Sequence, residues 1–213
     1  MVLFTIFCPI VAAVLIMLGA PARRTALAAS VLTFAAVLFL FASLDRSHAD
    51  FQHVTSFSIS PDWRLSFTTG LDGLSVIMVL LASIVTLAAV WFAGTIERHE
   101  NAFYACLLFI SGGAIGAFSS IDLFFFYAFH ELALIPTFLL IGIWGSGNRV
   151  AAAWKITIYL AIGSFILLLG LHLLYQRFLL ASRRFDIRVL QTAAVMGTTY
   201  THGKRPVSLQ RSL

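Results

Sequence analysis

Residues Phe124–Gly145 read FFFYAFHELALIPTFLLIGIWG, a nearly unbroken apolar run with one carboxylate, Glu131, near its middle. As a helix this run is long enough to cross a bilayer, for which about 20 residues suffice. An ionised side chain at that depth costs about 3 kcal/mol on insertion scales, so it normally faces the interior of a bundle or a hydrated cavity. We therefore predict a role for Glu131 in ion or proton movement. A buried structural hydrogen bond is the alternative.

Two neighbours of this acid also carry chemistry. Pro136 has no N–H and leaves the carbonyl of Leu132 without its helical partner, which predicts a kink within about one turn of Glu131. His130 is adjacent in sequence but points about 100° around the helix. We expect it to be a packed histidine bound to a backbone carbonyl.

The composition is that of a membrane protein. Hydrophobic residues make up 60% of the 213, charged residues 11%, and the mean hydropathy is +0.96, which excludes a soluble globular domain. The net charge of +5 lies in the last part of the chain, since residues 177–213 carry seven Lys and Arg against one Asp. We therefore expect a lipid bilayer, and not nucleic acid, as a partner.

The two cysteines, Cys8 and Cys106, lie in apolar segments without a CxxC spacing or a histidine at ligand spacing. Both are interpreted as small buried hydrophobes. The prediction is no metal and no cofactor in this chain.

The hydropathy pattern predicts an all-α, polytopic transmembrane helix bundle of about six helices. The expected spans are Val2–Ala20, Ala26–Leu44, Leu74–Thr95, Ala102–Ser119, Leu123–Trp144 and Ala151–Tyr175. Between the second and third, Phe57–Phe67 alternates apolar and polar residues around Pro61-Asp62, which predicts a short hairpin on the outer surface.

Several residues within the spans have predicted roles. Gly112 and Gly116 have the GxxxG spacing that allows close helix packing. Asp122 is expected to cap the helix that follows it. Lys155 lies one turn inside the last span, and two readings stay open for it: a lysine that reaches the interface, or a buried base in a proton path.

The connections of this bundle predict its orientation. Arg23, Arg24, Arg98 and Arg149 would share the cytoplasmic side, and Arg46 and Arg64 the outer side, as the positive-inside rule requires. Six crossings would leave the basic tail outside, against that rule. Either a crossing is miscounted or the tail does not belong to the bundle.

Three segments resemble a known family. GLDGLS (70–75), FYAFHELALIPTFLLIGIWG (126–145) and AAAWKITIY (151–159) are similar, in order and spacing, to chain M of proton-translocating NADH:quinone oxidoreductase, the mitochondrial subunit 4 type. This is an antiporter-like membrane subunit of respiratory complex I. Cation/proton antiporter subunits and membrane-bound hydrogenases are more distant relatives.

The resemblance implies a membrane-arm subunit of the bacterial inner membrane that packs against other membrane-arm subunits of complex I. Such a subunit translocates protons, coupled to quinone reduction elsewhere, without redox chemistry of its own. Glu131 then corresponds to the family's essential acid and Lys155 to the lysine that opens the sixth helix. In the family the acid works with a lysine on the seventh helix. An ammonium that approaches a carboxylate stabilises its charged form, and its departure favours proton uptake.

Family members continue through many further helices, whereas residues 177–213 are polar and basic. We therefore expect residues 1–176 to be the N-terminal part of an antiporter-like subunit, and 177–213 to be a disordered or non-native tail of a truncated chain. The alternative function is a structural or non-functional membrane fragment that only packs against partner subunits. A subunit of an antiporter or a membrane-bound hydrogenase is a further alternative.

Overall fold

The predicted all-α transmembrane bundle is confirmed by a computed structural model, which describes residues 1–44, 51–60, 65–94, 96 and 98–182. Within these residues, five helices are long and apolar enough to cross a membrane, and α1 is a shorter apolar helix of 16 residues. The helices are α1 (Val2–Met17), α2 (Ala22–Ala42), α3 (Gly73–Phe92), α4 (Glu100–Ser119), α5 (Leu123–Trp144) and α6 (Arg149–Ser182), and the strands are β1 (Gln52–Ser60) and β2 (Leu65–Leu71).

The first helix ends three residues before its predicted end at Ala20. Gly19 adopts a φ of +107°, a left-handed conformation that favours glycine. Its amide binds the carbonyl of Ile16, and the amide of Ala20 binds that of Leu15. These two bonds are those of a Schellman motif, which closes a helix C-terminus.

The second helix begins four residues earlier than predicted. Pro21 occupies the N-cap, and α2 starts at Ala22. Arg23 and Arg24, which we expected in a connecting loop, therefore lie in the first turn of α2. The third helix also ends before its predicted boundary, at Phe92.

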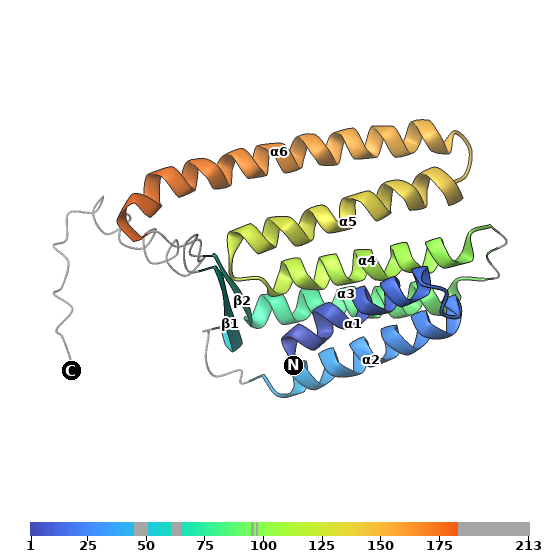
Figure 1. Cartoon of the computed structure of the whole chain (residues 1–213), viewed down its shortest axis with the longest axis horizontal. Helices are drawn as coiled ribbons and strands as arrows, with labels where there is room; N and C mark the ends of the chain where they lie inside the picture. The colour runs from blue at the N-terminus through green and yellow to red at the C-terminus, as the bar shows by residue number, and fades with distance from the viewer. Residues whose placement is uncertain (45–50, 61–64, 95, 97, 183–213) are drawn as a thin grey trace.

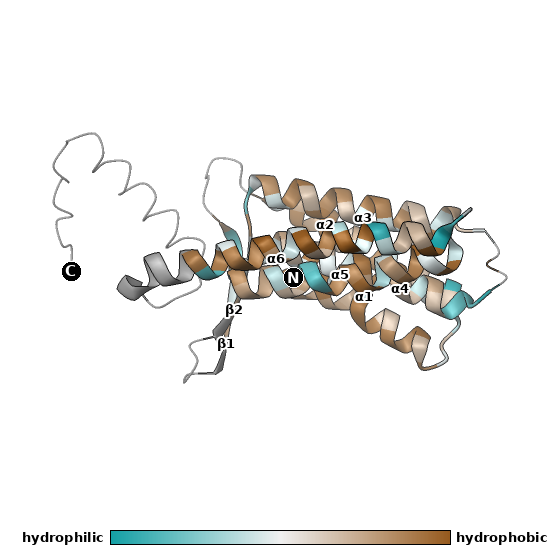
Figure 2. Cartoon of the chain, turned by 90° about the horizontal axis from the view of Figure 1, so that it is seen from above, coloured by the Kyte–Doolittle hydropathy of each residue, from teal (hydrophilic) through white to brown (hydrophobic). Residues whose placement is uncertain are grey.

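Consecutive helices run in opposite directions along the bundle (Figure 1). The connections α1–α2, α3–α4 and α5–α6 lie at one end, and the β1–β2 hairpin lies at the other with the α4–α5 turn. Figure 2 shows helices that are mostly hydrophobic along their length, with hydrophilic residues mainly near the connections and a few within the helices. This distribution is typical of helices that span a bilayer.

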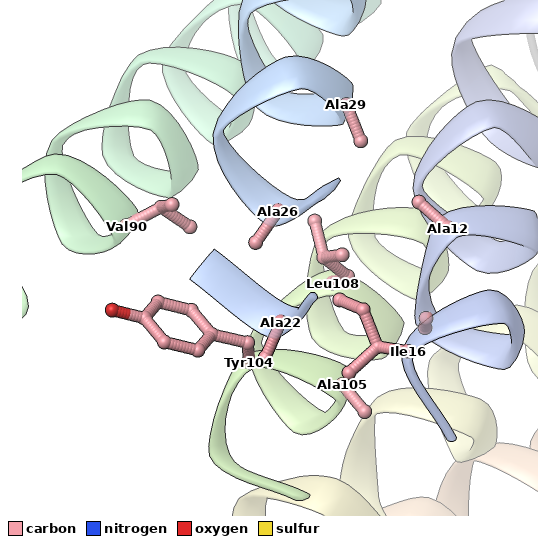
Figure 3. Close-up of a cluster of buried hydrophobic side chains, with 10 residues drawn as sticks. Ala12, Ile16, Ala22, Ala26, Ala29, Val90, Tyr104, Ala105 and Leu108 are labelled. Carbon is pink, nitrogen blue, oxygen red and sulfur yellow. The ribbon is translucent and has the colours of Figure 1, made fainter. Parts of the chain in front are cut away.

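Helix α4 is the centre of the bundle and packs against α1, α2, α3 and α5. Small residues dominate its contact with α1 and α2, where a cluster of buried side chains surrounds Leu108 (Figure 3). The members of this cluster are Ala12, Ala13, Ile16, Ala22, Ala26, Ala29, Val90, Tyr104, Ala105 and Leu108. Small side chains let helix backbones approach closely, as packing in a membrane requires.

The predicted hairpin is present as two antiparallel strands with Phe57 opposite Phe67. The expected turn residues, Pro61 and Asp62, lie outside the described residues. Phe67 is buried and packs its ring, in a tilted arrangement, against that of Phe125 of α5, with 4.6 Å between centroids. The hairpin therefore closes the end of the bundle from which α5 begins.

Helices α5 and α6 extend to one side of this core, with α6 packed on α5 and α5 on α4. Within the chain, most of the α4 span is buried, whereas α5 is mostly half-buried and α6 mostly exposed. Helix α6 continues to Ser182, beyond its predicted end at Tyr175 and into the segment expected to be the tail. The rest of the predicted tail lies outside the described residues.

Candidate functional site

The start of α5 is fixed by Asp122, as predicted. Its Oδ1 accepts hydrogen bonds from the amides of Phe124 at 2.8 Å and Phe125 at 3.3 Å, which are N–H groups without a partner inside the helix. The amide of Ile121, the residue before Asp122, donates a hydrogen bond to the carbonyl of Thr68 in β2 at 2.9 Å. Helix α5 therefore has a defined start, and Glu131 lies two turns further along it.

Glu131 is bound from the neighbouring helix. The hydroxyl of Ser164, on α6, donates a hydrogen bond to Oε1 of the Glu131 carboxylate. The same Ser164 oxygen lies 3.3 Å from the hydroxyl of Tyr127, which is one turn before Glu131 on α5. Ser164 is 4% exposed, whereas the Glu131 side chain is 36% exposed in this chain alone. The three polar groups form one cluster across the α5–α6 interface.

The expectation for His130 is wrong. No backbone carbonyl accepts from its Nδ1, which is buried without a hydrogen-bond partner and lies 3.8 Å from Oε1 of Glu131. The side chains of His130 and Glu131 approach each other although their Cα positions differ by about 100° around the helix. The two groups are therefore at ion-pair distance. The imidazole therefore belongs to the surroundings of the carboxylate.

Pro136 is the one fully buried residue of α5, and the helix continues past it to Trp144. The hydroxyl of the next residue, Thr137, binds the carbonyl of Ala133 at 2.7 Å. A proline at this position leaves the Leu132 carbonyl without its helical donor. The kink itself stays a prediction.

Lys155 does not meet Glu131. Helices α5 and α6 are antiparallel, so Trp154 lies beside Phe138, with 5.4 Å between ring centroids, while Ser164 lies beside Glu131. Nine residues separate Lys155 from Ser164, which is about 14 Å along a helix axis. The Lys155 side chain is exposed and bonds to none of the described residues. Both readings of this lysine remain predictions.

The predicted packing glycines lie at two different helix interfaces. A Cβ at Gly112 would collide with Ile10 of α1, and one at Gly116 would collide with the ring of Phe129 on α5. Gly113, which the sequence pattern did not single out, also approaches α5, where a Cβ would lie 2.9 Å from the carbonyl oxygen of Phe129. The glycines of α4 therefore allow both α1 and the site-bearing α5 to approach α4 closely.

No group of three or more His, Cys, Asp or Glu side chains that could hold a metal ion is found among the described residues. Cys8 and Cys106 are both free thiols. The chemistry that this cluster offers is the exchange of a proton at a carboxylate held by hydroxyl groups.

Two members of the cluster were missed from the sequence. Tyr127 precedes Glu131 by four residues, so the helical period alone places it on the same face. Ser164 gave no signal, because Thr157 and Tyr159 are further polar residues in the same apolar segment and the sequence does not say which of them faces α5.

Comparison with known proteins supports the resemblance seen in the sequence. Residues 120–198 match the family described as "NADH:quinone oxidoreductase/Mrp antiporter, TM". The chain is 32% identical over 184 residues to NADH-quinone oxidoreductase subunit M of Rickettsia bellii, covering 81% of this chain and 37% of that protein. The chain spans about a third of the length of the curated relatives it matches.

Solved structures show the same arrangement of helices. A chain of respiratory complex I from Thermus thermophilus with bound NADH superposes with a TM-score of 0.75 at 28% identity, over 89% of this chain and 38% of that one. A chain of an archaeal membrane-bound sulfane sulfur reductase superposes with a TM-score of 0.72 at 18% identity, over 92% of this chain and 31% of that one. The second likeness is one of fold alone. With its apolar spans, the chain is an integral multi-pass membrane protein similar to subunit M.

Proposed function

We propose that this chain acts as a membrane-arm subunit of a proton-translocating NADH:quinone oxidoreductase, in which Glu131 takes up and releases the proton. The observation that carries the proposal is a carboxylate in the middle of an apolar span, bound across a helix interface by Ser164, in a chain similar to subunit M. Such an acid is costly to insert and marks an ion or proton pathway. Electron transfer would occur in other subunits.

The surroundings of Glu131 suit reversible protonation. The Ser164 hydroxyl can bind the carboxylate as a donor, and it can remain a donor to the carbonyl oxygen when the acid is protonated. His130 approaches the same oxygen, at 3.8 Å. A single side chain can therefore exist in both protonation states without loss of its contact to α6. We propose that the chain is located in the bacterial inner membrane, among the other membrane-arm subunits.

The test is Glu131→Gln in the assembled complex, measured in inverted membrane vesicles. Proton uptake driven by NADH oxidation is expected to be abolished, because the amide cannot exchange a proton in the physiological range, while the complex remains assembled. Glu100→Gln is the matched control, because Glu100 is the first residue of α4 and is exposed. The complex with this variant should pump normally.

Undiminished proton uptake by the Glu131→Gln complex would contradict the proposal. The chain would then be a structural membrane piece that packs against partner subunits.

A further inference from the structure

We infer that Ser164 is a positioning residue for Glu131, that it holds one carboxylate oxygen on the α5–α6 interface, and that Tyr127 orients its hydroxyl. The inference rests on the proposed function of Glu131. Its geometric content, a hydrogen bond between two helices, is testable independently of proton transport.

The place of Ser164 in α6 is the first observation. Over Arg149–Leu173, Ala153 and Ser164 are the two fully buried residues of α6. Eleven residues separate them, which is close to three whole turns, so they lie on one face. Ala153 contacts α5 near Gly142, and that face therefore packs on α5 with a hydroxyl at the level of the carboxylate.

The direction of the hydroxyl is the second observation. Serine and threonine in helices commonly donate to a backbone carbonyl three or four residues earlier. The hydroxyls of Ser30, Ser83 and Thr137 do so, to Leu27, Leu80 and Ala133. Ser164 instead reaches across to Glu131 and Tyr127 on α5. The Ser164 hydroxyl therefore donates its hydrogen bond to α5 and not to the backbone of α6.

The proton count of the cluster sets the direction of each bond. A serine hydroxyl has one proton to donate and can also accept. When Ser164 donates to Oε1 of Glu131, the hydroxyl of Tyr127, 3.3 Å away, is left to donate to Ser164. Oε2 of Glu131 accepts no hydrogen bond from the described residues. One oxygen is thus held in place and the other is available for proton exchange.

The experiment is infrared difference spectroscopy of the whole chain in lipid nanodiscs, with Glu131→Gln used to assign the carboxyl band. Under acidic conditions Ser164→Ala is expected to shift the C=O stretch of protonated Glu131 to higher wavenumber, as loss of a donated hydrogen bond requires. Ser164→Thr keeps the hydroxyl and should keep the band. Tyr127→Phe should leave the bond to Glu131 intact and shift the band less.

Ser83→Ala is the matched control. Ser83 is also buried, but its hydroxyl bonds within its own helix, so the Glu131 band should not move. An unshifted band in folded Ser164→Ala, or a shift in Ser164→Thr as large as in Ser164→Ala, would overturn the inference. Proton uptake separates the two proposals: if Ser164→Ala moves the band while Glu131→Gln still pumps, the positioning bond stands and the proposed function fails.

Discussion

At the scale of single residues, Asp122 determines where α5 begins. Its carboxylate satisfies two amides at the start of the helix and is 4% exposed, so water does not replace it easily. Because Glu131 lies nine residues further along the same helix, the cap also fixes the depth of the acid in the bundle.

Asp122→Ala is expected to lower the free energy of unfolding by about 1 kcal/mol, the usual cost of removing an N-cap side chain. The measurement is helix content during titration of the detergent-solubilised chain with a denaturing detergent. Asp122→Asn is the control, since asparagine caps helices about as well as aspartate. If Asn destabilised the chain as much as Ala does, the negative charge and not the cap would be what matters.

Glu131 and Asp122 were predictable because each depends on its own position: an acid inside an apolar span, and an N-cap residue at a helix start. The contacts of His130 and Ser164 were not. Both depend on which rotamer and which helix face the tertiary packing selects, and a period of 3.6 residues leaves several faces open for a helix that is apolar all round.

At the scale of elements, the glycines of α4 set how closely its neighbours approach. Gly112 faces the backbone of α1 near Ile6, and Gly116 lies under the ring of Phe129 on α5. The GxxxG spacing predicted tight packing, yet the two glycines serve different partner helices. The spacing fixes a shared face of α4, but it does not fix whether one helix or two cover that face.

Gly112→Ala is expected to destabilise the chain by about 1–3 kcal/mol, because the added methyl group overpacks the α1–α4 contact. Gly116→Ala, against the aromatic ring, should cost a similar amount and loosen α5. Both are measured by the same detergent titration.

Gly163→Ala on α6 is the matched control for these variants. A Cβ there meets nothing within 4 Å, and alanine has the higher helix propensity, so this variant should be as stable as the parent or slightly more stable. Equal stability of Gly112→Ala and Gly163→Ala would mean that α1 does not pack on α4 as the structure has it.

At the scale of the whole molecule, one end of the bundle gathers basic residues. Arg23, Arg98 and Arg149 all lie at the end with the α1–α2, α3–α4 and α5–α6 connections (Figure 1). Arg149 donates to the carbonyl of Ile143 near the C-terminus of α5, where a positive charge is favourable, and Trp144 donates to the carbonyl of Arg98. The alternation of spans was predictable from hydropathy, whereas these contacts between connections were not.

The positive-inside rule predicts that this end faces the cytoplasm and that the β1–β2 hairpin faces outward. Single cysteines test this in a chain that carries Cys8→Ala and Cys106→Ala. Ser56→Cys, exposed on β1, should react with a membrane-impermeant maleimide from outside intact spheroplasts. Ser146→Cys, exposed in the α5–α6 connection, should react only after permeabilisation. The reverse pattern would invert the orientation, and labelling of both from one side would contradict the odd number of crossings, α3 to α5, between the two positions.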